Sequence, residues 1–169
     1  MKILLTYSSK TGNTKKVAEA IAETLQVSAI PVEENPSPVG CDLVVAGFWV
    51  DRGTADAKMK AYLGRLTRQK VAVFATLGAE ADSEHAAKCL ENGIALLGEG
   101  CDVVGRFICQ GKVADEMVEM MKKMFPAGHP HAMTADRLAR IEKAAAHPDA
   151  KDLAAAQSYF GKLRQELSA

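Results

Sequence analysis

The sequence lacks an excess of charge of either sign, because 21 Lys and Arg residues balance 21 Asp and Glu residues over a length of 169. A neutral chain has no general attraction for phosphate backbones or anionic lipid, so nucleic acid and membrane surfaces are not expected partners. Long hydrophobic runs are also missing. The longest, residues 43–50, is far shorter than the roughly 20 residues that span a bilayer, and the N-terminus shows no signal-peptide core. We therefore expect a cytoplasmic protein.

Cysteines are few, and no two of them form a C-x-x-C pair. They are Cys41, Cys89, Cys101 and Cys109. All four lie among apolar neighbours, which favours buried, reduced thiols over a redox pair or a metal site. The nucleotide loops G-x-x-x-x-G-K-[ST] and G-x-G-x-x-G are absent, as is the G-x-S-x-G of α/β-hydrolases. The overall composition, with 48% hydrophobic and 25% charged residues, is that of an ordinary globular domain.

Short β-rich runs alternate with longer helical patterns over the first two thirds of the chain. The expected strands are residues 2–7, 28–32, 42–49, 71–76 and 102–108, and the expected helices are residues 13–26, 55–66 and 83–97. Such an alternation predicts a parallel sheet covered on both faces, because parallel neighbours need a crossover that returns over the sheet. The predicted fold class is therefore α/β.

After Gly111 the pattern contains only helices, at residues 113–124, 134–145 and 149–167. In the last of these, apolar residues recur every three or four positions, which gives one stripe that must cover the sheet or a second subunit. We divide the chain into a sheet-forming domain over residues 1–125 and a helical C-terminal extension over residues 126–169, packed on the same domain. His129 and His131 flank a proline with no cysteine or carboxylate cluster nearby, so we expect no metal site.

A hydroxyl-rich turn, residues 7–14, joins the first strand to the first helix. Its sequence, YSSKTGNT, places hydroxyl groups, an amide and a glycine where backbone N–H groups and the positive end of a helix converge. This chemistry suits a phosphate that is held without a magnesium ion. The alternative interpretation is an ordinary capped turn.

The segment Ser9–Thr14 resembles the phosphate loop of the flavodoxins, a [ST]-x-T-G-x-T pattern that encloses the phosphate of flavin mononucleotide (FMN). The resemblance extends over about residues 1–125. It implies a doubly wound, five-stranded parallel sheet of order 2-1-3-4-5, with FMN at the carboxyl ends of strands 1 and 3 and extra C-terminal helices. It also implies that the phosphate is contacted by the side chains of Ser9, Thr11, Asn13 and Thr14. Lys10 and Gly12 are expected to contact it mainly through their backbone N–H groups.

A second loop of the expected site, residues 47–56, follows the most apolar strand. Trp49, the only tryptophan, is the candidate to stack on the flavin ring, and Phe48 is its rival; for either ring the alternative is core packing. In flavodoxins the corresponding loop carries a peptide that turns over when the flavin gains a proton, and Gly53 is the residue here that rotates most easily. The other expected contacts in this loop are Val50 and Asp51.

A third loop, residues 76–83, is expected to hold the other edge of the ring. Thr76, Leu77 and Gly78 are expected to line the pocket with backbone groups. The loop departs from the common flavodoxin pattern because it contains no Tyr or Trp. Aromatic stacking on both faces of the flavin is therefore not expected.

The C-terminal extension carries a further likeness. Residues 47–56, 129–134 and 146–148 resemble a subgroup of flavodoxin-like proteins from anaerobic bacteria, some of which serve as accessory proteins to a bilirubin reductase. This implies an FMN-binding electron carrier that passes electrons to a partner reductase, with no catalytic side chain of its own, as a monomer or weak homodimer. Two alternatives stay open. One is an FMN-dependent NAD(P)H:quinone-type oxidoreductase with its own substrate, and the other is a binding module that has lost its flavin, against which the intact Ser9–Thr14 segment argues.

Overall fold

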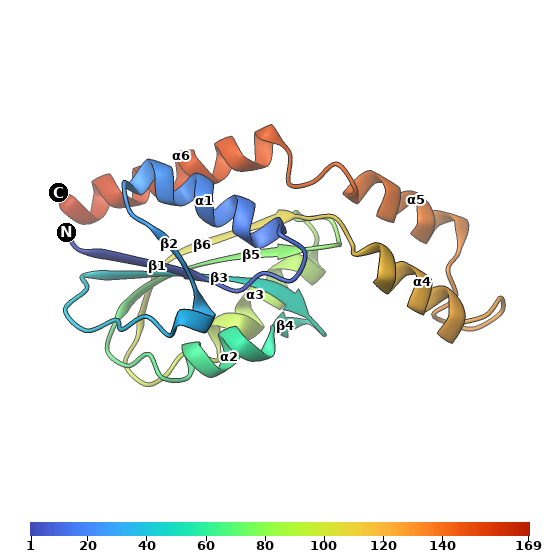
Figure 1. Cartoon of the computed structure of the whole chain (residues 1–169), viewed down its shortest axis with the longest axis horizontal. Helices are drawn as coiled ribbons and strands as arrows, with labels where there is room; N and C mark the ends of the chain where they lie inside the picture. The colour runs from blue at the N-terminus through green and yellow to red at the C-terminus, as the bar shows by residue number, and fades with distance from the viewer.

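A parallel sheet forms the centre of the molecule and lies between two layers of helices (Figure 1). The computed structural model of the chain describes residues 1–169. The five parallel strands, in their order across the sheet, are β2 (Ala29–Pro31), β1 (Ile3–Tyr7), β3 (Leu43–Asp51), β5 (Lys70–Leu77) and β6 (Asp102–Gln110). A short strand, β4 (Thr54–Ala55), pairs antiparallel with the end of β3. The order of the parallel strands confirms the predicted 2-1-3-4-5 topology.

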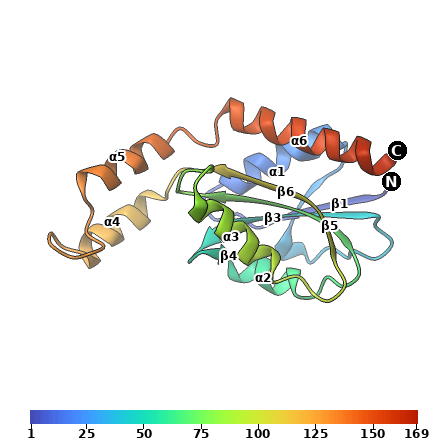
Figure 2. The same cartoon turned by 180° about the vertical axis from the view of Figure 1, so that it is seen from behind.

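Two pairs of helices cover the sheet, one pair on each face (Figure 2). They are α1 (Asn13–Leu25) and α6 (Ala150–Ser168) on one face, and α2 (Ala57–Leu63) and α3 (Glu84–Ile94) on the other. A single 3-10 turn, η1 (Val32–Glu34), follows β2. Each face has its own apolar cluster, and fully buried strand residues such as Val44 and Val45 alternate between the two.

The apolar stripe of α6 packs on the sheet beside α1. Its central residue, Phe160, is 1% exposed and meets the edge of Phe74 on β5, with ring centroids 6.1 Å apart. Asp149 begins the helix with a capping box, because its carboxylate accepts from Asp152 N–H while the Asp152 carboxylate accepts from Asp149 N–H. The predicted stripe therefore covers the sheet of its own chain.

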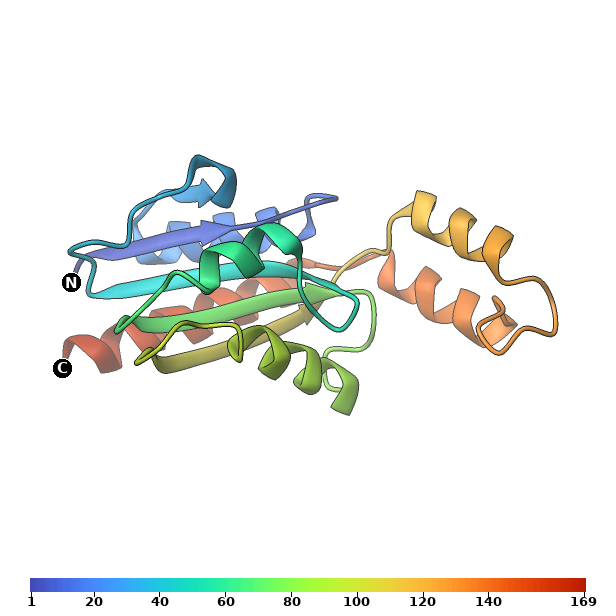
Figure 3. The same ribbon diagram turned by 90° about the horizontal axis from the view of Figure 1, so that it is seen from below.

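Two further helices, α4 (Asp115–Met124) and α5 (Ala135–Ala144), form a hairpin that projects beyond the ends of the strands (Figure 3). We call residues 112–148 the arm. Only Val118 of α4 and Ala144 of α5 are buried. The boundary predicted after residue 125 falls at the tip of the arm, between its two helices. No helix in the chain combines the length and the apolar character that crossing a bilayer requires.

Candidate cofactor-binding site

Two adjoining cavities lie at the carboxyl ends of β1, β3 and β5, where the three loops considered above meet the base of the arm. The first, which we call the apolar compartment, has a volume of about 180 Å³ and is lined by Lys10, Thr11, Asn13, Trp49, Val50, Thr76, Leu77, Gly78, Lys112, Val113, Ala114 and Met117. The second, the basic compartment, has a volume of about 480 Å³ and is lined by Lys10, Thr11, Asn13, Lys16, Lys112, Ala114, Asp115, Glu116 and residues 145–148. Because they share five residues, the cavities form one trough with an apolar end and a basic end.

The first loop presents backbone N–H groups to an oxygen atom. Gly12 precedes α1 with a φ of +92°, a left-handed conformation that glycine adopts without steric cost, and it gives the helix no side-chain cap. Ser9 Oγ accepts hydrogen bonds from the N–H groups of Gly12 at 3.1 Å and Lys15 at 3.3 Å. Convergence of these donors on one oxygen, at a helix start without acidic residues, fits an anion such as a phosphate.

Two side chains of this loop have protein partners that the sequence did not predict. Thr14 is 1% exposed, and its hydroxyl shares a hydrogen bond of 2.9 Å with the Thr76 hydroxyl, so it ties the start of α1 to the end of β5. Asn13 Nδ2 donates to the Lys112 carbonyl at 2.8 Å. The expectation that the Thr14 side chain contacts a phosphate is wrong, because this side chain is buried and lines neither compartment. Asn13 lines both compartments and also holds the base of the arm.

The second loop is largely a continuation of β3, which pairs with β4 as a hairpin. Successive residues of a strand point to opposite faces, and this separates the two candidate rings. Trp49 is half-buried and lines the apolar compartment. Phe48 is fully buried in the core against Gly93, where an added Cβ would lie 2.4 Å from the Phe48 ring. The alternative prediction that Phe48 stacks on the flavin is therefore wrong, because no ligand in the trough can reach its ring.

The tip of this hairpin rests on α3 and does not line the trough. Arg52 and Gly53 have φ values of +49° and +80°, the pair of positive values that a two-residue type I′ hairpin turn requires. Asn92 on α3 donates through Nδ2 to the Gly53 carbonyl at 2.8 Å. Of the predicted contacts in this loop, Val50 lines the apolar compartment, whereas Asp51 and Gly53 line neither compartment.

A buried carboxylate joins the first two loops. Asp56 is 2% exposed and accepts hydrogen bonds from the Ser8 hydroxyl and, as the N-cap of α2, from the N–H groups of Lys58 and Met59. The sequence shows an aspartate before a helix, which predicts the cap. Nothing local predicts the bond to Ser8, which lies 48 residues away. The link fixes the first loop against the start of α2.

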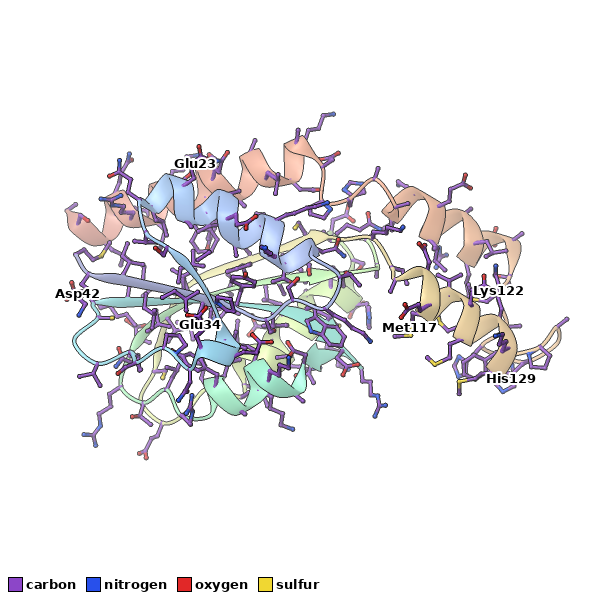
Figure 4. All side chains as sticks on the ribbon, in the orientation of Figure 1. Glu23, Glu34, Asp42, Met117, Lys122 and His129 are labelled. Atoms are coloured by element: carbon purple, nitrogen blue, oxygen red, sulfur yellow. The ribbon has the colours of Figure 1, made fainter.

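The third loop places Thr76, Leu77 and Gly78 in the lining of the apolar compartment, as expected. No aromatic ring lies there. Instead, Val113 and Met117 from the base of the arm line the same cavity, and sequence reasoning missed both. Figure 4 shows Met117 at the end of α4 nearest the sheet, with His129 at the far tip of the arm. The position of Val113 and Met117 in the cavity lining depends on how the arm packs against the third loop, and the sequence contains no local signal for that packing.

The charges around the apolar compartment come from two lysines. Lys10 Nζ lies 5.2 Å from the centroid of the Trp49 ring, within range of a cation–π interaction, and Lys112 pairs with Asp115 at 2.9 Å. Among the residues that line this compartment there is no His, Cys, Asp or Glu. Nearby on β6, burial raises the pKa of the Cys109 thiol to about 12, so this cysteine stays protonated near neutral pH and is a poor nucleophile.

The chain is similar in sequence to flavodoxin-like proteins over nearly its whole length. A family model described as a flavodoxin domain matches residues 4–161. The flavodoxin-like domain-containing protein BilS of Clostridioides difficile (strain CD3) is 32% identical over 168 residues, covering 96% of this chain and 95% of that protein. The protein of the same name from Clostridium symbiosum (strain WAL-14163) is 28% identical, covering 95% and 94%.

Solved structures share the fold at low sequence identity. A flavodoxin from the domain Archaea superposes with a TM-score of 0.57 at 16% identity, and both chains are covered completely. A flavodoxin, WrbA-like protein from Agrobacterium tumefaciens gives a TM-score of 0.59 at 14% identity, covering 99% of this chain and 97% of that one. These likenesses establish the sheet topology and the helical layers.

Proposed function

The chain belongs to the flavodoxin family and its cofactor is FMN, and from this premise we propose that it is an electron carrier that delivers electrons to a partner reductase. The observation that carries the proposal is the trough, with its apolar end beside Trp49 and its basic end beside the converging N–H groups of the first loop. FMN when bound supplies one-electron and two-electron redox chemistry. The protein binds and orients the cofactor.

The donor set of the trough fits the two chemical halves of FMN. Lys10, Lys16 and Thr11 surround the basic compartment, and the N–H groups of Gly12 and Lys15 already converge on an oxygen atom, which suits a phosphate. The apolar compartment offers Trp49 and aliphatic side chains, which suit a flat ring system. The sum of the two compartment volumes lies within the range of about 300–1,000 Å³ that is typical of small-molecule sites.

A carrier fits the apolar compartment better than an enzyme with its own substrate. General acid–base catalysis needs a positioned group such as His, Asp or Glu, and none lines this cavity. The two lysines that do line it are engaged, Lys10 over Trp49 and Lys112 with Asp115. Four free cysteines, two of them buried and two half-buried, also suit a reducing compartment, and we place the carrier in the cytoplasm.

For the partner, we propose a bilirubin or related tetrapyrrole reductase. The support is the similarity to two BilS proteins along nearly the whole chain, arm included, together with the resemblance of residues 129–134 and 146–148 to accessory proteins of such a reductase. The carrier itself is expected to be a monomer or weak homodimer.

The test is electron transfer between purified proteins. The FMN-loaded protein is reduced anaerobically and mixed with the candidate reductase and its tetrapyrrole, and flavin absorption is followed in a stopped-flow spectrometer. Reoxidation that requires both reductase and substrate supports the proposal. Steady turnover of NAD(P)H and a quinone without any partner protein would favour the quinone-type oxidoreductase instead.

A further inference from the structure

We propose that the arm is part of the cofactor site, with Met117 acting as the non-aromatic wall of the flavin ring compartment that the third loop does not supply. This inference rests on the proposed FMN site. Met117 lies in the first turns of α4 and lines the apolar compartment together with Trp49 and Leu77. The sequence predicted only backbone groups of Thr76, Leu77 and Gly78 on this side of the ring, and no side chain that covers it.

The base of the arm is seated tightly on the third loop. Gly111 N–H donates to the Leu77 carbonyl at 2.8 Å, and Gln110 Nε2 donates to the Gly78 carbonyl at 3.3 Å. A Cβ at Gly78 would lie 2.5 Å from Val113 Cγ2, closer than side chains tolerate. Glycine at this position therefore lets Val113 close against the loop, which brings α4 and Met117 to the cavity.

The arm is also tied to the first loop at one of its chain ends, and its two chain ends are bonded to each other. Asn13 Nδ2 donates to the Lys112 carbonyl at 2.8 Å, and Lys112 N–H donates to the His147 carbonyl at 2.8 Å. A Cβ at Gly111 would lie 2.7 Å from Asn13 Nδ2, so this junction is close-packed. The arm therefore leaves the body at a fixed position beside the phosphate-binding loop.

A methionine at this wall has a defined chemical effect. Its thioether makes favourable contacts with aromatic rings, so Met117 contributes to flavin affinity. It has no electron-rich ring face, so it does not oppose the added negative charge of the reduced flavin as a second aromatic residue would. Met120 and Met124 on the same helix are 47% and 59% exposed and do not line the cavity, which makes them matched controls.

The experiment measures FMN affinity by fluorescence quenching when apoprotein is titrated with FMN. Met117→Ala should raise Kd about tenfold, which corresponds to about 1.4 kcal/mol, whereas Met120→Ala should change it less than twofold. Met117→Leu keeps the apolar volume and should remain within about threefold of the parent value, which separates loss of the wall from loss of folding. An unchanged Kd for Met117→Ala overturns the inference.

A second readout uses the reduction potential. Met117→Tyr places a ring at the wall and should lower the equilibrium constant for adding the second electron about tenfold, which is about 59 mV for a one-electron step. Met120→Tyr should leave both potentials unchanged. Equal effects of the two substitutions would also overturn the inference. If the unmodified protein binds no FMN, both the proposed function and this inference fail. If it binds FMN and the Met117 substitutions change neither Kd nor potential, this inference alone fails.

Discussion

At the scale of single residues, the first loop separates side chains that are free for a ligand from side chains that the protein already uses. Thr11 lines both compartments, and its hydroxyl takes no part in the side-chain hydrogen bonds of this loop, which involve Ser8, Ser9, Asn13 and Thr14. Asn13 and Thr14 are bonded to partners 99 and 62 residues away in the sequence. A local motif predicts the loop and its N–H donors, but it contains no information about such distant partners.

This division predicts different effects of Thr11→Ala and Asn13→Ala. Thr11→Ala removes a donor to the phosphate, worth about 1.5–3 kcal/mol for a charged acceptor, so FMN affinity should fall at least tenfold. Riboflavin, which lacks the phosphate, should bind Thr11→Ala as it binds the parent protein. Asn13→Ala also releases the base of the arm and should weaken both ligands. Titrations of apoprotein with each ligand measure this, and equal loss of FMN and riboflavin in Thr11→Ala would contradict the assigned phosphate site.

The rings of the second loop show a similar limit of sequence reasoning. Phe48 and Trp49 are adjacent aromatic residues after an apolar run, and both read as stacking candidates. The strand continues to Asp51, and its alternation sends Phe48 into the core and Trp49 to the trough. Phe48 and Trp49 lie where the predicted strand, residues 42–49, overlaps the predicted loop, residues 47–56, so the sequence alone does not assign either ring to a face of the sheet.

At the scale of helices and strands, periodicity predicted most of the fold. The parallel sheet is flanked on both sides, so its strands read as continuous apolar runs and its helices as single stripes. The stripe of α6 could have covered a second subunit, and it covers the sheet. The arm was not predictable in this way, because short amphipathic helices fit many apolar surfaces and their placement depends on contacts such as Gly78 with Val113.

Packing of α6 on the sheet predicts a clear loss of stability on Phe160→Ala. Phe160 is 1% exposed and touches Phe74, Phe107 and Tyr159, so its removal leaves a cavity that costs about 3–5 kcal/mol. Urea denaturation of the apoprotein measures the change in unfolding free energy. Leu138→Ala on the exposed side of α5 is the matched control and should cost less than about 1 kcal/mol. FMN affinity of the folded Phe160→Ala protein should stay unchanged, and a large loss of affinity would show that α6 shapes the trough.

At the scale of the whole molecule, the charge balance and the trough point to the same redox behaviour. The chain carries no net charge, and two lysines line the apolar compartment without a carboxylate among its lining residues. Lys58, a third basic residue near the loops in sequence, pairs with Glu33 at 2.6 Å and lines neither compartment. Negative charge added to the flavin is therefore met mainly by Lys10.

This arrangement predicts a potential for the second electron that is less negative than in acidic flavodoxins with aromatic rings on both flavin faces. Spectroelectrochemistry of the FMN-loaded protein measures both couples. Lys10→Gln should make the second couple more negative, whereas Lys58→Gln, which changes the same charge outside the trough, should leave it unchanged. A second couple as low as in those acidic, doubly stacked proteins would show that another feature controls it.

The measurement that tests the central claim most directly is an anaerobic reductive titration of the purified, FMN-loaded protein, followed by visible absorption. An electron carrier of this family should hold one FMN per chain and take up electrons in two resolved one-electron steps. Uptake in a single two-electron step, or a protein that retains no flavin absorption after gel filtration, would contradict the account.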